Sequence, residues 1–390
     1  MEPENPTPVP EVPGDRDVGL KWGDTVRASR IAGPDSSDRG DFLLWAFIGP
    51  QGLRCGWSAG LFIAAFKILL PVAGTLAMIL VPWLFRDRTS PMGMLVGETI
   101  PLAAVVAAGF LLALVEGRRI REYNLVGPRR VRHSLAGALT GFGAVSALLG
   151  LLELGGWVRV TPGAEGMRAI LASGAVWAAV FLMVGLVEEG SFRCFLFASL
   201  TRGVNFWWAV AAEAGICAYA VFSANHVTAL GVFLFALAGI LPCAWLAWRR
   251  NSQAGLWQAA WVTSTLFGAI HTGNRGENWI GIFAAAGIGF VFCVSVKVTG
   301  SVWWAIGCHA AWDWAETYFY GTPDSGMIAK GHLMTATSSG PAIWSGGLDG
   351  PEGSLLVIPI MLLILLVLVV QYGRRRQAEA PGAMMHQAAG

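Results

Sequence analysis

The chain has 390 residues, of which 55% are hydrophobic and only 13% are charged. Soluble domains average roughly 25% charged residues, so this composition excludes an ordinary soluble globular protein. The formal net charge of +2 gives no reason to expect a nucleic-acid partner. Apolar blocks near 20 residues long recur along the chain, and helices of that length span a lipid bilayer. We therefore predict an all-α, polytopic transmembrane helical bundle.

The chain begins with a segment rich in Pro, Asp and Arg that has no apolar core, which predicts a flexible or surface-lying tail. About ten spans follow, with an eight-helix-like core and a candidate inserted hairpin. The expected spans are 57–85, 92–115, 134–154, 169–200, 206–223, 228–248, 255–271, 280–298, 301–320 and 355–372. The expected parts are the tail (1–40), N-terminal helices (41–168), a central transmembrane core (169–320, with the hairpin at 206–248), a loop (321–353) and the last helix with a basic tail (354–390).

Three basic clusters, at 118–132, 249–250 and 374–376, fall on one side of the membrane if both termini are cytoplasmic. Cytoplasmic loops carry an excess of Lys and Arg, so we expect both termini inside, in a multi-pass protein of a bacterial inner membrane. Depth is a difficulty: Glu188 falls near the inner face and His271 near the outer one. A broken, tilted or re-entrant helix around Gly190 or Gly273 would resolve it.

Glu188, Glu189 and Arg193 lie inside an apolar run. A charge at the centre of a membrane helix costs about 2.5–3.5 kcal/mol on insertion scales, so intramembrane acids are functional candidates. Glu189 and Arg193 are four residues apart and share a helix face, so they can form an ion pair. Glu188 points about 100° away and lacks this local partner. A free carboxylate in an apolar site is suited to act as a general base, although it could instead pair elsewhere and only position helices.

His271 ends an apolar span, four residues after Phe267 and three before Asn274. A neutral imidazole there could bind a metal, hold a water, donate to an oxyanion or simply cap a helix. The spacing also occurs in Phe222 and His226, but that pair falls at a turn between two spans.

His309, Asp313 and Glu316 lie at positions i, i+4 and i+7 of another span and share one helix stripe. An acid beside an imidazole fixes its tautomer and ring angle, although such a pair can also be a self-satisfied packing contact. The remaining isolated acids and polar residues are interpreted as packing, interfacial, loop or cap residues: Glu98, Glu153, Glu213, Glu277 and Asn278.

Several enzyme motifs are missing from the sequence. There is no His-Glu-x-x-His, no Gly-x-Ser-x-Gly, no phosphate-binding loop and no dinucleotide fingerprint. We expect no cofactor, but a zinc ion bound by Glu188, His271 and His309 stays open because ligands from three helices are geometrically allowed.

Together, Glu188-Glu189 with Arg193, Phe267 with His271, and His309 with Asp313 resemble the motifs of the CPBP family of CAAX proteases and bacteriocin-processing enzymes (Abi proteins). The resemblance covers about residues 170–320. It implies that Glu188 activates the water that attacks a peptide bond and that His271 helps to hold this water. It also implies that His309 and Asp313 stabilise the oxyanion, while Glu189 and Arg193 form a structural pair.

Asp313 stands where the prenyl proteases carry Asn. A carboxylate donates a hydrogen bond only when protonated, so orienting His309 is the preferred role for it. The expected activity is an intramembrane endopeptidase acting on a peptide or membrane-protein substrate in the lipid bilayer. The alternatives are a zinc-dependent membrane protease using the same residues, a non-catalytic immunity or scaffold protein, and a transporter.

Overall fold

The computed structural model describes residues 45–387 except 86, 88, 164–165 and 224–227. The tail predicted at 1–40 lies outside the described residues, as does His226. Contacts divide the chain into two units, Met1–Arg54 and Cys55–Gly390. In the first unit, β1 (Ile48–Gly49) and β2 (Gly52–Leu53) pair antiparallel.

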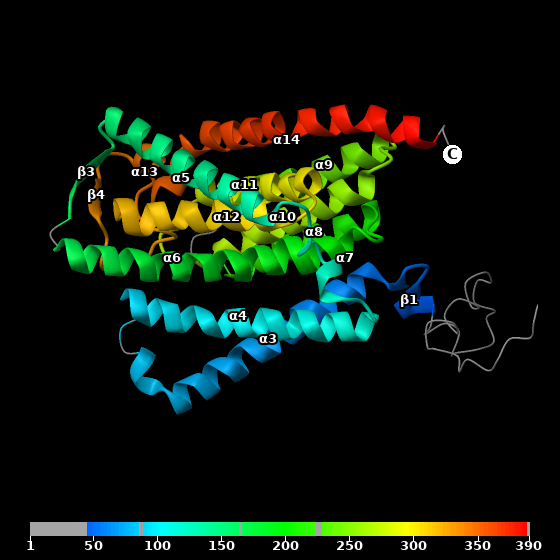
Figure 1. The fold of residues 1–390 in the computed structure, drawn as a ribbon, viewed down its shortest axis with the longest axis horizontal. Helices are drawn as coiled ribbons and strands as arrows, with labels where there is room; N and C mark the ends of the chain where they lie inside the picture. The colour runs from blue at the N-terminus through cyan, green and yellow to red at the C-terminus, as the bar shows by residue number, and fades with distance from the viewer. Residues whose placement is uncertain (1–44, 86, 88, 164–165, 224–227, 388–390) are drawn as a thin grey trace, which may run out of the picture. The chain divides into compact units, whose positions relative to one another are not determined.

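The second unit is a bundle of long helices (Figure 1). Its helices are α3 (Cys55–Leu80), α4 (Pro91–Glu116), α5 (Arg130–Leu154), α6 (Met167–Glu189), α7 (Phe197–Leu200), α8 (Phe206–Ser223), α9 (Ala229–Trp248), α10 (Ala254–His271), α11 (Trp279–Thr299), α12 (Trp303–Asp313), α13 (Ala342–Ser345) and α14 (Val357–Gln387). Short 3₁₀ turns lie at Pro82–Phe85, Ile120–Glu122 and Pro351–Gly353.

Seven of the described helices are long and apolar enough to cross a membrane: α3, α4, α5, the continuous segment Arg168–Leu200, α8, α9 and α11. The predicted polytopic helical bundle is thus confirmed, although we expected about ten spans. The apolar part of α14 is shorter, Val357–Tyr372. α10 buries Gln258, Thr263 and Ser264 within the bundle, which lowers its hydropathy without exposing these groups to lipid.

Glycines bring α12 into close contact with α5 (Figure 1). A Cβ atom at Gly137 would lie 2.1 Å from the carbonyl oxygen of Trp304, and one at Gly141 would lie 2.1 Å from that of Cys308. On the facing helix, a Cβ atom at Gly307 would lie 2.0 Å from the carbonyl oxygen of Ser134. Small residues spaced by four let helix backbones approach closely in membranes. This contact fixes α12, which carries His309.

π-helical segments follow the acidic residues on both α6 and α12. They run over Gly190–Leu196 and Trp314–Tyr320. π-helical turns inside α-helices are rare and occur frequently at functional sites. Gly190 keeps right-handed helical dihedral angles, φ −60° and ψ −48°, and the helical segment continues to Leu200, so a break at Gly190, one of the solutions offered for the depth difficulty, is absent.

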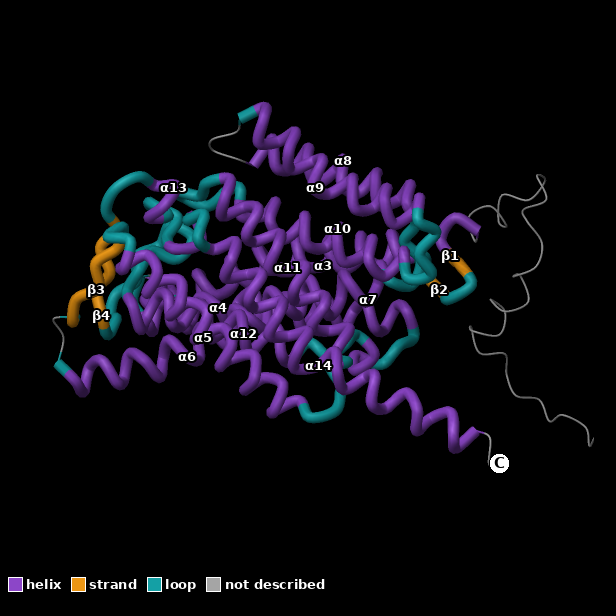
Figure 2. Tube along the Cα trace, turned by 90° about the horizontal axis from the view of Figure 1, so that it is seen from above, coloured by secondary structure: helices purple, strands orange, loops and turns teal. Residues whose placement is uncertain are grey.

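The helices α8 and α9 contact each other and both contact α10 (Figure 2). Glu213 on α8 is fully buried and accepts a hydrogen bond of 2.8 Å from the Thr265 hydroxyl of α10. Gly239 on α9 leaves room for this carboxylate, because a Cβ atom there would lie 2.3 Å from Oε2 of Glu213. The isolated acid Glu213 therefore has the packing environment expected for a residue that joins helices.

The connection between the second π-helical segment and α14 has its own structure. Its strand β4 (Met334–Ser338) pairs antiparallel with β3 (Val158–Pro162), which precedes α6. The loop also contacts the turn before α11, where the Asn278 amide donates to the Gly353 carbonyl at 3.2 Å. The Asn278 side chain caps α11 by accepting from the backbone N–H groups of Ile280 and Gly281, which confirms its assignment as a cap residue.

Candidate active site

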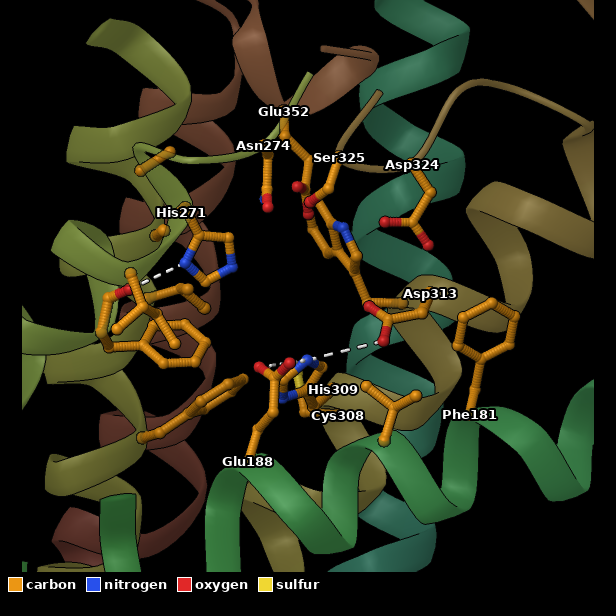
Figure 3. A pocket seen from close by; sticks show the side chains of 18 of the residues that line it. Phe181, Glu188, His271, Asn274, Cys308, His309, Asp313, Asp324, Ser325 and Glu352 are labelled. Carbon is orange, nitrogen blue, oxygen red and sulfur yellow. Dashed lines mark hydrogen bonds and ion pairs between the residues drawn. The ribbon is translucent and has the colours of Figure 1, made fainter. Parts of the chain in front are cut away.

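A cavity of about 440 Å³ lies between α4, α6, α10, α11, α12, α14 and the loop that precedes α14 (Figure 3). Most of the predicted site residues line this single cavity: Glu188, Phe267, His271, Asn274, His309 and Asp313. Glu189 and Arg193 do not line the cavity; both are fully buried beside it. The structure thus brings together residues that are separated by more than 120 positions in the sequence.

His309 lies among three carboxylates. Its Nδ1 atom is 2.8 Å from Oε1 of Glu189, and its Nε2 atom is 3.7 Å from Oε2 of Glu188 and 3.5 Å from Oδ2 of Asp313. Since a carboxylate only accepts, Nδ1 donates to Glu189. The two longer distances exceed those of good hydrogen bonds, so Nε2 faces Glu188 and Asp313 across the cavity without being tightly bound to either.

Glu189 therefore has a broader role than its predicted pairing with Arg193. Its Oε2 atom lies 3.2 Å from Nε of Arg193, as the helical spacing predicted, while Oε1 binds His309. Asp313, which we expected to orient His309, faces Nε2 of the ring, and Glu189 holds the ring from the buried side through Nδ1. A hydrogen-bonded carboxylate of this kind fixes the tautomer and angle of an imidazole.

The Arg193 side chain has its own tightly fitted pocket. Its guanidinium carbon lies 4.5 Å from the ring centroid of Phe267 and 5.5 Å from that of Phe292, within the range of cation–π attraction. A Cβ atom at Gly289 would lie 2.5 Å from Nη2, so the glycine makes room for the side chain. Phe267 thus connects the first two sequence motifs by lying between Arg193 and His271.

His271 lies on another wall of the cavity (Figure 3). Its Nδ1 atom is 2.7 Å from the Phe267 carbonyl oxygen, one helical turn earlier. Because a carbonyl oxygen only accepts, Nδ1 carries a proton and donates it to this bond. In the neutral ring, Nε2 then has a free lone pair, which suits it to accept a hydrogen bond from water or to bind a metal. Asn274 lines the same wall and donates to Glu277 at 3.2 Å.

The side chain of Glu188 is 28% exposed and projects from α6 into the cavity (Figure 3). The depth difficulty seen in the sequence concerned Glu188 and His271. Both residues line the same cavity, Glu188 from α6 and His271 from the last residue of α10.

Three carboxylates that sequence reasoning missed also line the cavity: Glu98, Asp324 and Glu352. Glu98 had been interpreted as a packing or interfacial residue. The rule on intramembrane acids that selected Glu188 could have selected it too. Asp324 and Glu352 come from the loop between Tyr320 and α14, where no periodicity marks a residue as facing inward (Figure 3).

The carboxyl groups of the loop before α14, and Glu277 in the turn before α11, have strongly raised pKa values. Burial, followed by repulsion from Asp349 and Glu352, raises the pKa of Glu277 to about 9. Burial and repulsion from Asp324 and Asp349 raise the pKa of Glu352 to about 8. Burial raises the pKa of Asp349 to about 7 and also raises that of Asp324. Removal from water disfavours the charged form of a carboxyl group, and neighbouring acids add to this effect.

The residues expected to bind zinc meet some of the requirements of a zinc site. Glu188, His271 and His309 line one cavity, and Nδ1 of each histidine is engaged by protein, which leaves both Nε2 atoms as the ligating positions. However, within the described part of the chain no three His, Cys, Asp or Glu side chains are arranged as ligands of one ion.

Residues 243–315 match the family model described as "Type II CAAX prenyl endopeptidase Rce1-like". The matched segment contains His271, His309 and Asp313 but not Glu188, Glu189 or Arg193. No curated protein and no solved structure matched the chain. The family match confirms the resemblance to the CPBP family predicted from the three motifs, and with the apolar helices it supports an integral membrane protein related to proteases.

Proposed function

We propose that this relative of the type II CAAX prenyl endopeptidases is an intramembrane endopeptidase in which Glu188 activates the attacking water. The observation that carries the proposal is the position of Glu188: its Oε2 atom lies 3.7 Å from Nε2 of His309, in a cavity that His271 also lines. A general base must lie within hydrogen-bond reach of the proton it abstracts, directly or through one water.

In this mechanism, a water in the cavity donates one hydrogen bond to Nε2 of His271 and another to Glu188. Glu188 removes a proton as the water oxygen attacks the carbonyl carbon of the scissile peptide. When protonated on both nitrogens, His309 donates from Nε2 to the oxyanion that forms, while Nδ1 stays bound to Glu189. Collapse of the intermediate breaks the C–N bond, and Glu188 returns the proton to the leaving amine.

The remaining site residues have positioning roles in the proposal. Glu189 and Arg193 form a buried pair that holds the His309 ring from behind. Asp313 faces Nε2 of His309. Between turnovers, its carboxylate can accept a hydrogen bond from the protonated Nε2 atom. Phe267 supports Arg193, His271 and His309 through ring contacts.

The test is a cleavage assay on co-expressed candidate membrane substrates. Glu188→Gln keeps the shape of the side chain but removes its basicity, so we expect cleavage to be lost while the protein still accumulates in the membrane. Glu153→Gln is the matched control, because Glu153 lies at the exposed end of α5 and does not line the cavity. Cleavage by Glu188→Gln would contradict the proposal.

A zinc-dependent protease using Glu188, His271 and His309 is a second candidate, favoured by the two Nε2 atoms available in one cavity. Zinc bound there would polarise the scissile carbonyl or acidify a bound water. Metal analysis of the purified protein separates the two mechanisms. Stoichiometric zinc, together with activity that a chelator removes and zinc restores, would favour the second.

For location, we propose a multi-pass protein of a bacterial inner membrane with both termini in the cytoplasm. The basic loop between α4 and α5 lies at one end of the bundle, where Glu116 binds Arg202 at 2.6 Å. The opposite end carries the β3–β4 pair and the ion pair of Lys330 with Asp87 at 2.9 Å. The positive-inside rule then puts the loop before α14 on the outer face. Reporter fusions at both termini that gave opposite locations would contradict this orientation.

A further inference from the structure

The cavity wall built by the loop before α14 is acidic. Asp324 and Glu352 belong to this wall, and Glu98, Glu188 and Asp313 line the same cavity from the helices. Among the described residues that line the cavity, there is no lysine or arginine. Electrostatic interactions are stronger in a partly desolvated cavity than in water. A cavity whose described lining holds five carboxyl groups and no lysine or arginine therefore favours cationic ligands over anionic ones.

Glu316 lies directly behind this wall and is fully buried. Its Oε2 atom accepts a 2.9 Å hydrogen bond from Nε1 of Trp312, a residue that also lines the cavity. Its Oε1 atom has no hydrogen-bond partner among the described residues. This oxygen faces the loop, since a Cβ atom at Gly350 would lie 3.0 Å from it. A buried acceptor without a donor costs free energy that a donating ligand would recover.

The other loop acids have few donors as well. Asp324 accepts one hydrogen bond from the Thr317 hydroxyl at 2.7 Å. Asp349, fully buried behind the wall, faces the Asn278 backbone N–H through Oδ2 at 3.4 Å, while its Oδ1 atom has no partner among the described residues. A carboxylate offers about four acceptor positions, so the acceptors outnumber the donors that the protein supplies.

We propose that Asp324 and Glu352, supported from behind by Glu316 and together called the acidic wall, bind a lysine or arginine side chain of the substrate near the scissile bond. The proposal rests on the proposed function, whose substrate class it specifies. An ammonium or guanidinium group supplies donors and positive charge together, and its charge favours the ionised form of Asp324 and Glu352, whose pKa values are raised by burial. A free C-terminal carboxylate placed beside Asp324 and Glu352 would face acidic groups and, among the described lining residues, no lysine or arginine, which disfavours it at this wall.

An organic cation suits the wall better than a metal ion, because the described residues contain no three acids with the geometry of ligands for one ion. If the loop lies on the outer face, the basic residue of the substrate would sit at the outer boundary of the membrane. Lysine and arginine reach membrane boundaries readily, since their long stems lie along apolar surface while the charged head stays in a polar environment.

The test has a cleavage arm and a binding arm. In the first, purified full-length protein in detergent cleaves a mixed-sequence decapeptide library, and mass spectrometry gives the residues around each cleaved bond. We expect Lys and Arg to be enriched roughly tenfold at one fixed position, which corresponds to about 1.4 kcal/mol. In Asp324→Asn and Glu352→Gln this enrichment, measured as the ratio of Lys- or Arg-containing to neutral sequences among the cleaved peptides, should fall. Glu153→Gln should keep it.

The second arm measures binding without cleavage. Glu188→Gln is titrated in a calorimeter with acetyl-Leu-Lys-Leu-amide and with acetyl-Leu-Gln-Leu-amide. We expect the lysine peptide to bind roughly tenfold more tightly, and Glu352→Gln in the same background to remove the difference. Equal binding of the two peptides would overturn the acidic wall whether or not the protein is a protease. Cleavage without Lys or Arg enrichment would overturn it and leave the proposed protease standing. A lysine preference in a protein that cleaves nothing would overturn the protease and keep the binding site.

Discussion

The Nδ1 atom of His309 lies 2.8 Å from a carboxylate oxygen of Glu189, and Glu189 has no exposed surface. The other oxygen of that carboxylate lies 3.2 Å from Nε of Arg193, which is equally buried. A single buried acid at the end of α6 therefore connects Arg193, in the π-helical segment that follows, to the histidine of α12. This connection explains why adjacent glutamates can have different roles: Glu189 holds the site, and Glu188 faces the cavity.

Glu189→Gln should destabilise the protein strongly. The substitution leaves the Arg193 guanidinium buried without its counter-charge, and breaking a buried ion pair in this way costs about 3–5 kcal/mol. Thermal unfolding of the purified protein in detergent measures the effect. Glu153→Gln, at an exposed position, should leave the melting temperature unchanged. Equal melting temperatures for both variants would show that the buried pair contributes little.

The α5–α12 contact should not tolerate a side chain at Gly137. A Cβ atom there would lie 2.1 Å from the Trp304 carbonyl oxygen, so Gly137→Ala must push the helices apart. We expect a loss of about 1–3 kcal/mol, the usual cost of overpacking, and reduced cleavage because α12 carries His309. Gly143→Ala is the matched control on the same helix, since nothing lies within 4 Å of its Cβ position. If Gly143→Ala were the more damaging change, the packing described here would be wrong.

The loop before α14 should loosen as the pH rises. The pKa of Glu277 is raised from an ordinary 4.5 to about 9, and that of Glu352 to about 8, so the packed loop retains protons that an open loop would release. The packed state is then most favoured below about pH 4.5 and loses stability as the pH approaches 8–9.

Hydrogen exchange of residues 321–353 at pH 6 and pH 9 measures this change, after correction for the intrinsic effect of pH on exchange. Protection should be lower at pH 9, and Glu277→Gln should reduce the difference. The pKa of Asp87 is shifted in the opposite direction, because hydrogen bonds from Thr89 and Lys330 lower it to about 2. Asp87 therefore stays ionised, and keeps these contacts, at both pH 6 and pH 9. A loop that is better protected at pH 9 would contradict the cause assigned to these shifts.

Asp313→Asn should retain most activity, whereas Asp313→Ala should not. Asp313 faces Nε2 of His309 at 3.5 Å, and an asparagine can still accept from that nitrogen. Removing a group that orients a functional histidine typically costs about 10–100-fold, so we expect a loss of that size in kcat for Asp313→Ala. Equal losses in both variants would instead indicate that the charge of Asp313 is required.

The sequence predicted the fold class because blocks of apolar residues are a local signal, and it predicted the Glu189–Arg193 pair because helical spacing is local too. It could not predict that Glu189 also binds His309, since that contact joins positions 120 residues apart. The close packing of Gly137 against Trp304 depends on a helix crossing that no periodicity encodes.

The site residues divide in the same way into those with a local sequence signal and those without one. Each of Glu188, His271 and His309 carried a signal as a polar group at the end of, or inside, an apolar span. Asp324 and Glu352 carried none, because a loop has no periodicity to show which side chains point inward. Two of the three expected spans outside the group of seven, α10 and α12, hold buried polar groups. On α12 these include Asp313 of the site, whereas Gln258 and Thr263 of α10 lie outside the cavity.

The central claim is that Glu188 acts as the base without a metal. Its most direct test is the cleavage rate of purified protein stripped of metal and reconstituted in lipid vesicles, measured with and without Glu188→Gln. General-base catalysis contributes about 10²–10⁴-fold, so the stripped protein should cleave at its full rate and the variant should be slower by at least about 10². A variant that cleaves at the rate of the unmodified protein, or stripped protein that is inactive until zinc is added, would contradict the claim.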